Sequence, residues 1–205
     1  MKDLFSNTDE NNNYSIDLPD ADVVMYPNFF SSIKSDELFK KLKETTTWNQ
    51  ETIKFYGKEI DLPRLTAWYG DEGKNYSYSG IKVVPMKWTP TLLEIKSKIE
   101  LVSGVIFNSV LLNYYRTGKD SVSWHSDDEP ELGKNPPIGS VSFGAKRPFQ
   151  LKHIENKKLK GTVELTNGSF LLMKGPTQHF WQHQIPKTTK QIGERINLTF
   201  RIIRK

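Results

Sequence analysis

The 205-residue sequence contains no cysteine, which excludes disulfide frameworks and thiolate nucleophiles and leaves only nitrogen and oxygen ligands for any metal. The lack of disulfides also favours a reducing compartment. No apolar run approaches the roughly 18 residues that a membrane-spanning helix needs, residues 1–7 lack the apolar core of a signal peptide, and no internal repeat is present. We therefore expect an intracellular monomer with no membrane partner, in the cytoplasm or the nucleus depending on the organism.

Charge is unevenly distributed along the chain. Residues 1–22 hold one lysine and six acidic residues, a net charge of −5, and because the whole chain carries +5, the remaining residues carry +10. A basic body of this size favours a polyanion such as nucleic acid. Many basic soluble proteins bind no nucleic acid, so the charge alone leaves both interpretations open.

The length fits one domain with a substantial core. Residues 1–15 are polar and rich in asparagine, and we predict a disordered tail there. Two helices are predicted next, one capped by Ser35 and one running from Thr89 to Gly104. From Ser109 onward the apolar residues alternate with period two, and frequent turn signals favour an antiparallel sandwich or barrel.

The stretch Trp124-His125-Ser126-Asp127-Asp128 suggests a metal site. His125 and Asp127 point the same way on an extended backbone, because side chains alternate between the faces of a strand. His183 would complete the set of two histidines and one carboxylate that non-haem Fe(II) oxygenases use. The spacing alone is weak evidence, and a solvated turn is the alternative.

Two further pairs lie on predicted strands. Arg195 and Arg201 are six residues apart, so both guanidinium groups share one face of a strand, where a fork of donors beside a metal suits a small dicarboxylate. The alternative is two arginines on a solvated face. Asn113 and Tyr115 share the face of Leu111, and polar groups on a core-facing side need partners, of which a bound ligand is one.

Aromatic and basic residues outside these strands give weaker signals. Tyr56 lies at the tip of a predicted hairpin, where it is either a partly covered surface residue or a wedge between bases. Tyr76 and Tyr78 share a face if extended, which gives either an aromatic wall for a flat substrate or ordinary packing. A basic turn is a candidate for phosphate contacts or a solvated turn: Lys157, Lys158 and Lys160.

Several phrases, taken together and in order, resemble the AlkB family of Fe(II)- and 2-oxoglutarate-dependent dioxygenases, specifically its members that repair alkylated nucleic acid bases. The resemblance covers residues 50–203 and rests on these phrases: Pro63-Arg64, Tyr69-Gly70-Asp71, Tyr76-x-Tyr78-Ser79-Gly80, Asn113-Tyr114-Tyr115, Trp124-His125-Ser126-Asp127-Asp128-Glu129, Ser140-Val141-Ser142-Phe143-Gly144 and Arg195-Ile196-Asn197-Leu198-Thr199-Phe200-Arg201. It implies a mainly β fold with flanking helices (α+β) and a double-stranded β-helix, or jelly-roll, core. Residues 16–205 would form one dioxygenase domain, with an extension and nucleotide-recognition lid in 16–104 and the catalytic core in 105–205.

The resemblance also assigns roles to residues. It implies Fe(II), 2-oxoglutarate and O₂ as cofactors, with His125, Asp127 and His183 as the iron ligands. The residues that would hold 2-oxoglutarate are Asn113, Tyr115, Arg195 and Arg201. The residues that would contact the substrate are Tyr56, Arg64, Tyr76, Tyr78, Ser79, Asp128 and Glu129.

The activity implied is oxidative demethylation of bases such as 1-methyladenine and 3-methylcytosine, first in DNA and second in RNA, with release of formaldehyde, succinate and CO₂. The chemistry is consistent with the residues, because a methyl group on a ring nitrogen has no good leaving group for acid/base catalysis. A base in a duplex must be flipped out, and methylation that abolishes pairing lowers that cost. The alternatives are the same chemistry on RNA or on a protein side chain, and a nucleic-acid-binding module with a vestigial metal site.

Overall fold

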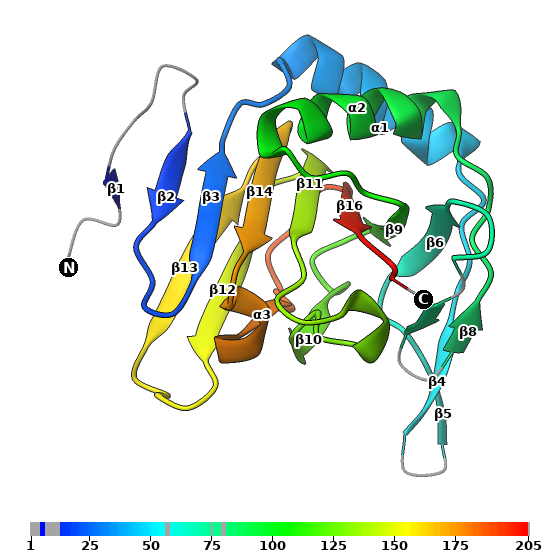
Figure 1. Cartoon of the computed structure of the whole chain (residues 1–205). Coiled ribbons are helices and arrows are strands. Elements are labelled where there is room, and N and C mark those ends of the chain that lie inside the picture. The colour runs from blue at the N-terminus through cyan, green and yellow to red at the C-terminus, as the bar shows by residue number, and fades with distance from the viewer. Residues whose placement is uncertain (1–4, 7–12, 56–57, 75, 79–80, 205) are drawn as a thin grey trace.

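The computed structural model describes residues 5–6, 13–55, 58–74, 76–78 and 81–204. Two antiparallel sheets face each other (Figure 1), with eight strands in the large sheet and four in the small one. In spatial order the large sheet contains β1 (Phe5–Ser6), β2 (Tyr14–Ile16), β3 (Asp22–Tyr26), β14 (Ser169–Lys174), β11 (Ile138–Gly144), β16 (Arg195–Arg201), β9 (Ser109–Tyr115) and β6 (Leu65–Gly70). The small sheet contains β10 (Val122–His125), β15 (Trp181–Ile185), β12 (Arg147–His153) and β13 (Lys160–Leu165). Two hairpins lie outside these sheets: β4 (Thr52–Phe55) with β5 (Lys58–Asp61), and β7 (Tyr76–Tyr78) with β8 (Ile81–Val83).

The strands from β9 to β16 form a double-stranded β-helix. The chain contributes β9, β11, β14 and β16 to the large sheet and β10, β12, β13 and β15 to the small sheet, so most connections cross from one sheet to the other. Alternation with period two puts one face of each strand into the shared interior, as in β12, where every second residue is buried. The predicted mainly β jelly roll is confirmed.

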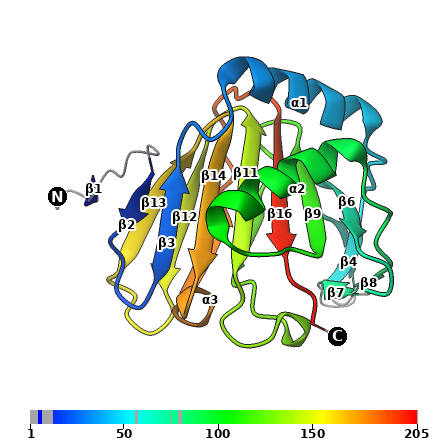
Figure 2. The ribbon, with the colours of Figure 1, turned by 45° about the horizontal axis from the view of Figure 1, so that its top comes forward.

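Two long helices cover the outer face of the large sheet (Figures 1 and 2): α1 (Ser32–Thr45) and α2 (Pro90–Ser103). The second helix has the predicted ends, because Thr89 caps it and Gly104 ends it at a φ of +67°. The first helix begins earlier than predicted. Its cap is Ser31, whose Oγ accepts from the Lys34 backbone, whereas Ser35 is buried one turn inside the helix. Both serines precede good helix formers, so sequence spacing does not separate them.

The segment predicted to be a disordered tail contributes to the large sheet. Phe5–Ser6 pairs with Ser15 and Ile16, and Tyr14 and Ser15 pair with β3. The domain boundary predicted at residue 15 therefore falls inside β2. Among the described residues, no helix has the length and apolar character needed to span a bilayer.

Candidate metal centre

His125, Asp127 and His183 come together in the interior between the two sheets. One ligand atom from each lies within 4.8 Å of the others. His125 ends β10 and is the cross-strand partner of His183 on β15, and the two imidazole rings are 4.3 Å apart between centroids. Asp127 lies just past the end of β10, in a bend that turns its carboxylate toward the same point. The three side chains that the sequence separates by up to 58 positions therefore form one cluster.

Each of the two histidines has a ring nitrogen whose lone pair is available to a metal. Nδ1 of His125 lies 2.8 Å from the carbonyl of Ser123, which can only accept, so Nδ1 carries the proton and Nε2 is free to coordinate. His183 is buried and stacks on Phe149, with ring centroids 4.9 Å apart. Burial, assisted by the neighbouring His125, lowers the pKa of His183 to about 3, so its imidazole is neutral at physiological pH.

Asp127 is a fully buried carboxylate held in its charged form. Burial by itself would raise the pKa of Asp127, but Arg201, at 2.5 Å from Oδ1, and the two histidines outweigh it and hold the pKa below its ordinary value. The backbone N–H of Asp127 donates to Oε1 of Gln178 at 3.0 Å, which fixes the turn that carries the carboxylate. An anionic oxygen and two imidazole nitrogens are a donor set that fits Fe(II).

A pocket with an empty volume of about 470 Å³, its mouth included, opens behind the cluster. It is lined by residues that alternate along β9, β11 and β16: Leu111, Asn113, Tyr115, Ile138, Ser140, Arg195, Asn197, Thr199 and Arg201. The predicted arginine pair is thus buried on one inner face, not solvated, and the predicted Asn113 and Tyr115 lie in the same pocket.

Arg195 has donors left over for a ligand. Its Nη2 donates to Oγ of Ser142 at 2.9 Å and to Oδ1 of Asn197 at 2.7 Å, while Nε and Nη1 are buried with no hydrogen-bond partner. Burial lowers the pKa of Arg195 to about 10, so the guanidinium stays charged at neutral pH. A buried cation with unsatisfied donors that faces a pocket fits the carboxylate of a cosubstrate such as 2-oxoglutarate.

The family model of the 2OG-Fe(II) oxygenase superfamily matches residues 22–201. Human alpha-ketoglutarate-dependent dioxygenase alkB homolog 3 is 40% identical over 190 residues, which cover 88% of this chain and 66% of that protein. Mouse DNA oxidative demethylase ALKBH2 is 37% identical over 188 residues, which cover 87% of this chain and 79% of that protein. The chain belongs to the AlkB family of this superfamily.

This AlkB-family chain spans just under two thirds of the length of the human alkB homolog 3. The solved structure of OsALKBH1 superposes with a TM-score of 0.59 at 15% identity, covering 88% of this chain and 96% of that chain, and supports the fold alone. The family uses Fe(II), 2-oxoglutarate and O₂, and the donors described above fit all of these requirements.

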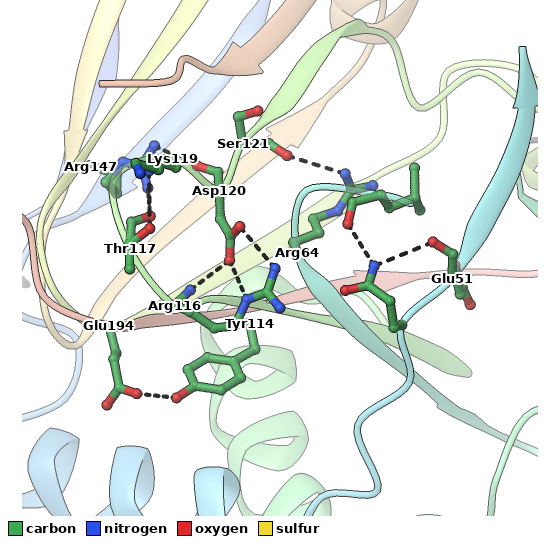
Figure 3. Close-up of polar contacts among 12 residues, drawn as sticks. Glu51, Arg64, Tyr114, Arg116, Thr117, Lys119, Asp120, Ser121, Arg147 and Glu194 are labelled. Carbon is green, nitrogen blue, oxygen red and sulfur yellow. Dashed lines mark hydrogen bonds and ion pairs between the residues drawn. The ribbon is translucent and has the colours of Figure 1, made fainter. Parts of the chain in front are cut away.

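The predicted substrate residues lie in different surroundings. Arg64 is buried, and its Nε donates to Oδ1 of Asn113 at 2.7 Å. Its Nη1 donates to the carbonyl of Ser121 at 3.3 Å (Figure 3). Asp128 is exposed and Glu129 is half-buried. Tyr76 and Tyr78 belong to β7, whose backbone alone is described, and two residues lie outside the described part of the chain: Tyr56 and Ser79.

Sequence reasoning missed several polar residues of the pocket. Asn197 accepts at Oδ1 from Ser140, Ser142 and Arg195, and so connects β11 to β16. Thr199 accepts from Nδ2 of Asn197 at 3.0 Å. Both have the same parity as Arg195 and Arg201, so the alternation that paired the arginines also predicts these two residues to face inward.

Gln178 offers a test of how the AlkB-family fold positions Asp127. Gln178 lies in the one-turn helix α3 (Thr177–Phe180), is 1% exposed, and accepts the Asp127 N–H. Replacing Gln178 with alanine is expected to weaken Fe(II) binding on the order of tenfold, because partners behind a metal ligand typically contribute 10–100-fold. Equilibrium titration with Fe(II) measures the change, and His179→Ala, an exposed substitution in the same turn, is the matched control. Equal Fe(II) affinity in Gln178→Ala and the unmodified protein would show that the turn at Asp127 keeps its conformation without the hydrogen bond to Gln178.

The guanidinium group of Arg147 binds three backbone carbonyls in the loops after β9 and β15. It is 1% exposed, and its guanidinium donates to the carbonyls of Thr117 (3.4 Å), Asp120 (3.0 Å) and Pro186 (2.7 Å); Figure 3 shows the first of these beside the Arg116–Asp120 ion pair. Tyr115 lies between two cations, 5.6 Å from Arg147 and 5.0 Å from Arg195.

Replacing Arg147 with methionine is expected to lower the free energy of unfolding by about 2–3 kcal/mol, because three partly buried carbonyls lose their donor. The affinity for 2-oxoglutarate is expected to fall as well, since Tyr115 loses one of its two flanking guanidiniums. Urea unfolding and calorimetric titration of the cosubstrate measure the two effects. Lys119→Met, in the same loop but exposed, is the control, and a stable Arg147→Met protein would contradict the assignment.

Proposed function

We propose that this chain catalyses oxidative demethylation of alkylated bases, such as 1-methyladenine and 3-methylcytosine, in DNA and secondarily in RNA. The overall conversion takes the N-methyl base, O₂ and 2-oxoglutarate to the free base, formaldehyde, succinate and CO₂. Fe(II), when bound, supplies the oxidation of a methyl group that acid/base chemistry cannot remove. The protein would act as a monomer in the cytoplasm or nucleus.

The observation that carries this proposal is the position of His125 between two cavities. The inner pocket contains the arginines, and His125 also lines a second cavity, the outer cleft. That cleft is lined by Trp124, Arg64 and the β4–β5 hairpin, whose Ile53 and Ile60 are cross-strand partners. A base entering the outer cleft would meet the metal position from one side, while the cosubstrate would occupy the other.

The residues of this chain have separate tasks in the reaction. Arg195 binds a carboxylate and holds it at the closed end of the inner pocket, while Arg201 keeps Asp127 ionised and oriented. His125 and His183 would supply nitrogen lone pairs to the metal. The buried walls around them exclude water, which protects a strong oxidant from side reactions.

Two kinds of observation support a nucleic acid substrate: the charge of this chain and the name of one relative. The chain after residue 22 carries a net charge of +10, which favours a polyanion. Asp128 is exposed three positions after His125, where a carboxylate would attract a base made cationic by methylation. One relative is named a DNA oxidative demethylase.

The test is turnover of a 3-methylcytosine oligonucleotide with Fe(II), ascorbate and 2-oxoglutarate. We expect stoichiometric formaldehyde and succinate, with restoration of unmodified cytosine. Competition between methylated DNA, methylated RNA and a methylated peptide separates the proposal from its alternative, the same chemistry on RNA or a protein side chain. Absence of formaldehyde from every nucleic acid substrate would overturn the proposal.

A further inference from the structure

The outward side chains of the small sheet form a flat polar face, here called the outer face. Alternation along β12 and β15 buries His183 and its neighbours on the inner side and leaves every second residue on the outer side. The outer face consists of Trp124, Pro148, Gln150, Lys152, Lys160, Thr162, Glu164, Gln182 and Gln184. Helices α1 and α2 lie against the large sheet, on the other side of the molecule (Figure 2).

Trp124 is the aromatic residue of the outer face, and a cation lies over it. Nζ of Lys152 is 4.4 Å from the centroid of the Trp124 ring. Lys152 comes from β12, and β15 separates β12 from β10, so its side chain crosses one whole strand to reach the indole. The amides of Gln150 and Gln184 are bonded to each other at 2.7 Å beside this pair. Tryptophan, lysine and amides are thus gathered on one surface.

Trp124 also borders the route to the metal position. It directly precedes His125 on β10, which is the edge strand of the small sheet, and it lines the outer cleft together with His125. Adjacent residues of a strand point to opposite faces and are about 3.3 Å apart along it. Because both residues nevertheless line the outer cleft, a polymer with one unit beside His125 has its next unit within reach of Trp124.

We propose that the outer face binds the single strand that flanks the target base, with Trp124 stacking on the neighbouring base and Lys152 contacting its phosphate. This inference rests on the proposed function and names the path of its substrate. Lys152 and Lys160 are cationic, and the one carboxylate among these residues, Glu164, is 3.5 Å from Lys146. Aromatic and basic groups on a four-stranded sheet are a stacking platform for unpaired bases. A duplex would hide the base faces that an indole needs.

The decisive measurement compares long and short substrates. For a methylated single strand of about 15 nucleotides, Trp124→Ala is expected to raise KM roughly tenfold, because stacking on an aromatic is worth about 1–3 kcal/mol per base. For the methylated mononucleotide, which has no flanking base, KM is expected to rise much less, because this substrate loses only the part of the outer-cleft wall that Trp124 supplies. An equal rise in KM on both substrates, or none on either, would overturn the proposal.

Lys152→Ala gives an independent readout in case Trp124→Ala disturbs His125. Loss of one phosphate contact is expected to reduce the slope of log Kd against log salt by about 0.7 for a single strand. Lys98→Ala is the matched control, since Lys98 lies 5.8 Å from the ring of Phe30 on the helix side of the molecule. The salt series uses an unmethylated strand and needs no turnover, so it tests the outer face even if demethylation fails. An unchanged slope in Lys152→Ala would contradict the proposal.

Discussion

Replacing Asp127 with alanine is expected to abolish Fe(II)-dependent activity and to lower the free energy of unfolding of the metal-free protein by about 3–5 kcal/mol. Asp127 and Arg201 are 1% and 2% exposed, and the Oδ1 to Nη2 distance is 2.5 Å. Removing the carboxylate takes away a charged partner from a buried guanidinium, which costs far more than losing a surface ion pair. Urea unfolding in the presence of a chelator measures the stability without any contribution from metal.

A double substitution separates the structural role of Asp127 from its metal-binding role. Asp127→Ala combined with Arg201→Met is expected to recover most of the lost stability, because neither charge of this buried pair remains, and to recover no activity. Arg201→Met alone is expected to destabilise the fold about as much as Asp127→Ala. Strictly additive losses in the double variant would show that the two side chains do not act as a pair.

The Asp127–Arg201 pair also makes the free energy of unfolding depend on pH. The pKa of Asp127 is lower in the folded protein than its ordinary value, so the unfolded chain binds the proton more tightly. Its contribution to stability is therefore fully present above the unfolded pKa of about 4 and is lost as the pH falls below it. In Asp127→Ala this part of the acid dependence is expected to disappear.

Strand parity made much of the site predictable. The spacings of Asn113 with Tyr115 and of Arg195 with Arg201 correctly place each pair on one inner face, because period two is a local property of the backbone. The same rule applied to Asn197 and Thr199 also predicts that these two residues line the pocket. The position of His183 was harder to predict, because its contact with His125 depends on the register between β10 and β15. That register is set by the packing of whole sheets.

The roles of residues that depend on loop conformation could not be predicted from the sequence. Arg147 reads as the first residue of an ordinary strand, and only the folding of the loops at Thr117 and Pro186 surrounds it with carbonyls. Gln178 lies in a four-residue helix that no periodic pattern marks. The sequence predicts a polar tail at Tyr14 and Ser15, because the pairing of β2 with β1 and β3 is decided by the partner strands and not by the composition of β2.

Arg195 is expected to show the opposite stability behaviour to Asp127. Replacing Arg195 with methionine is expected to keep or raise the stability of the protein without cosubstrate, while raising the Kd for 2-oxoglutarate on the order of a hundredfold. Burial lowers the pKa of Arg195 to about 10, a cost of about 3 kcal/mol to the folded state at neutral pH. Methionine removes that cost and nearly preserves the volume. Oδ1 of Asn197 stays satisfied, because Ser140 and Ser142 still donate to it.

Ligand-induced stabilisation provides the readout. At 100 times Kd, a cosubstrate that binds only the folded state adds about 2.7 kcal/mol to the free energy of unfolding. We expect that gain in the unmodified protein with Mn(II) and 2-oxoglutarate, and a gain of only about 0.4 kcal/mol in Arg195→Met, because the same concentration is then about equal to Kd. Arg195→Lys is the control for charge, since it keeps a cation but loses the planar fork, and it should fall between the two. A full gain in Arg195→Met would mean that the unsatisfied Nε and Nη1 donors do not receive the cosubstrate, and that its carboxylate is bound elsewhere in the pocket.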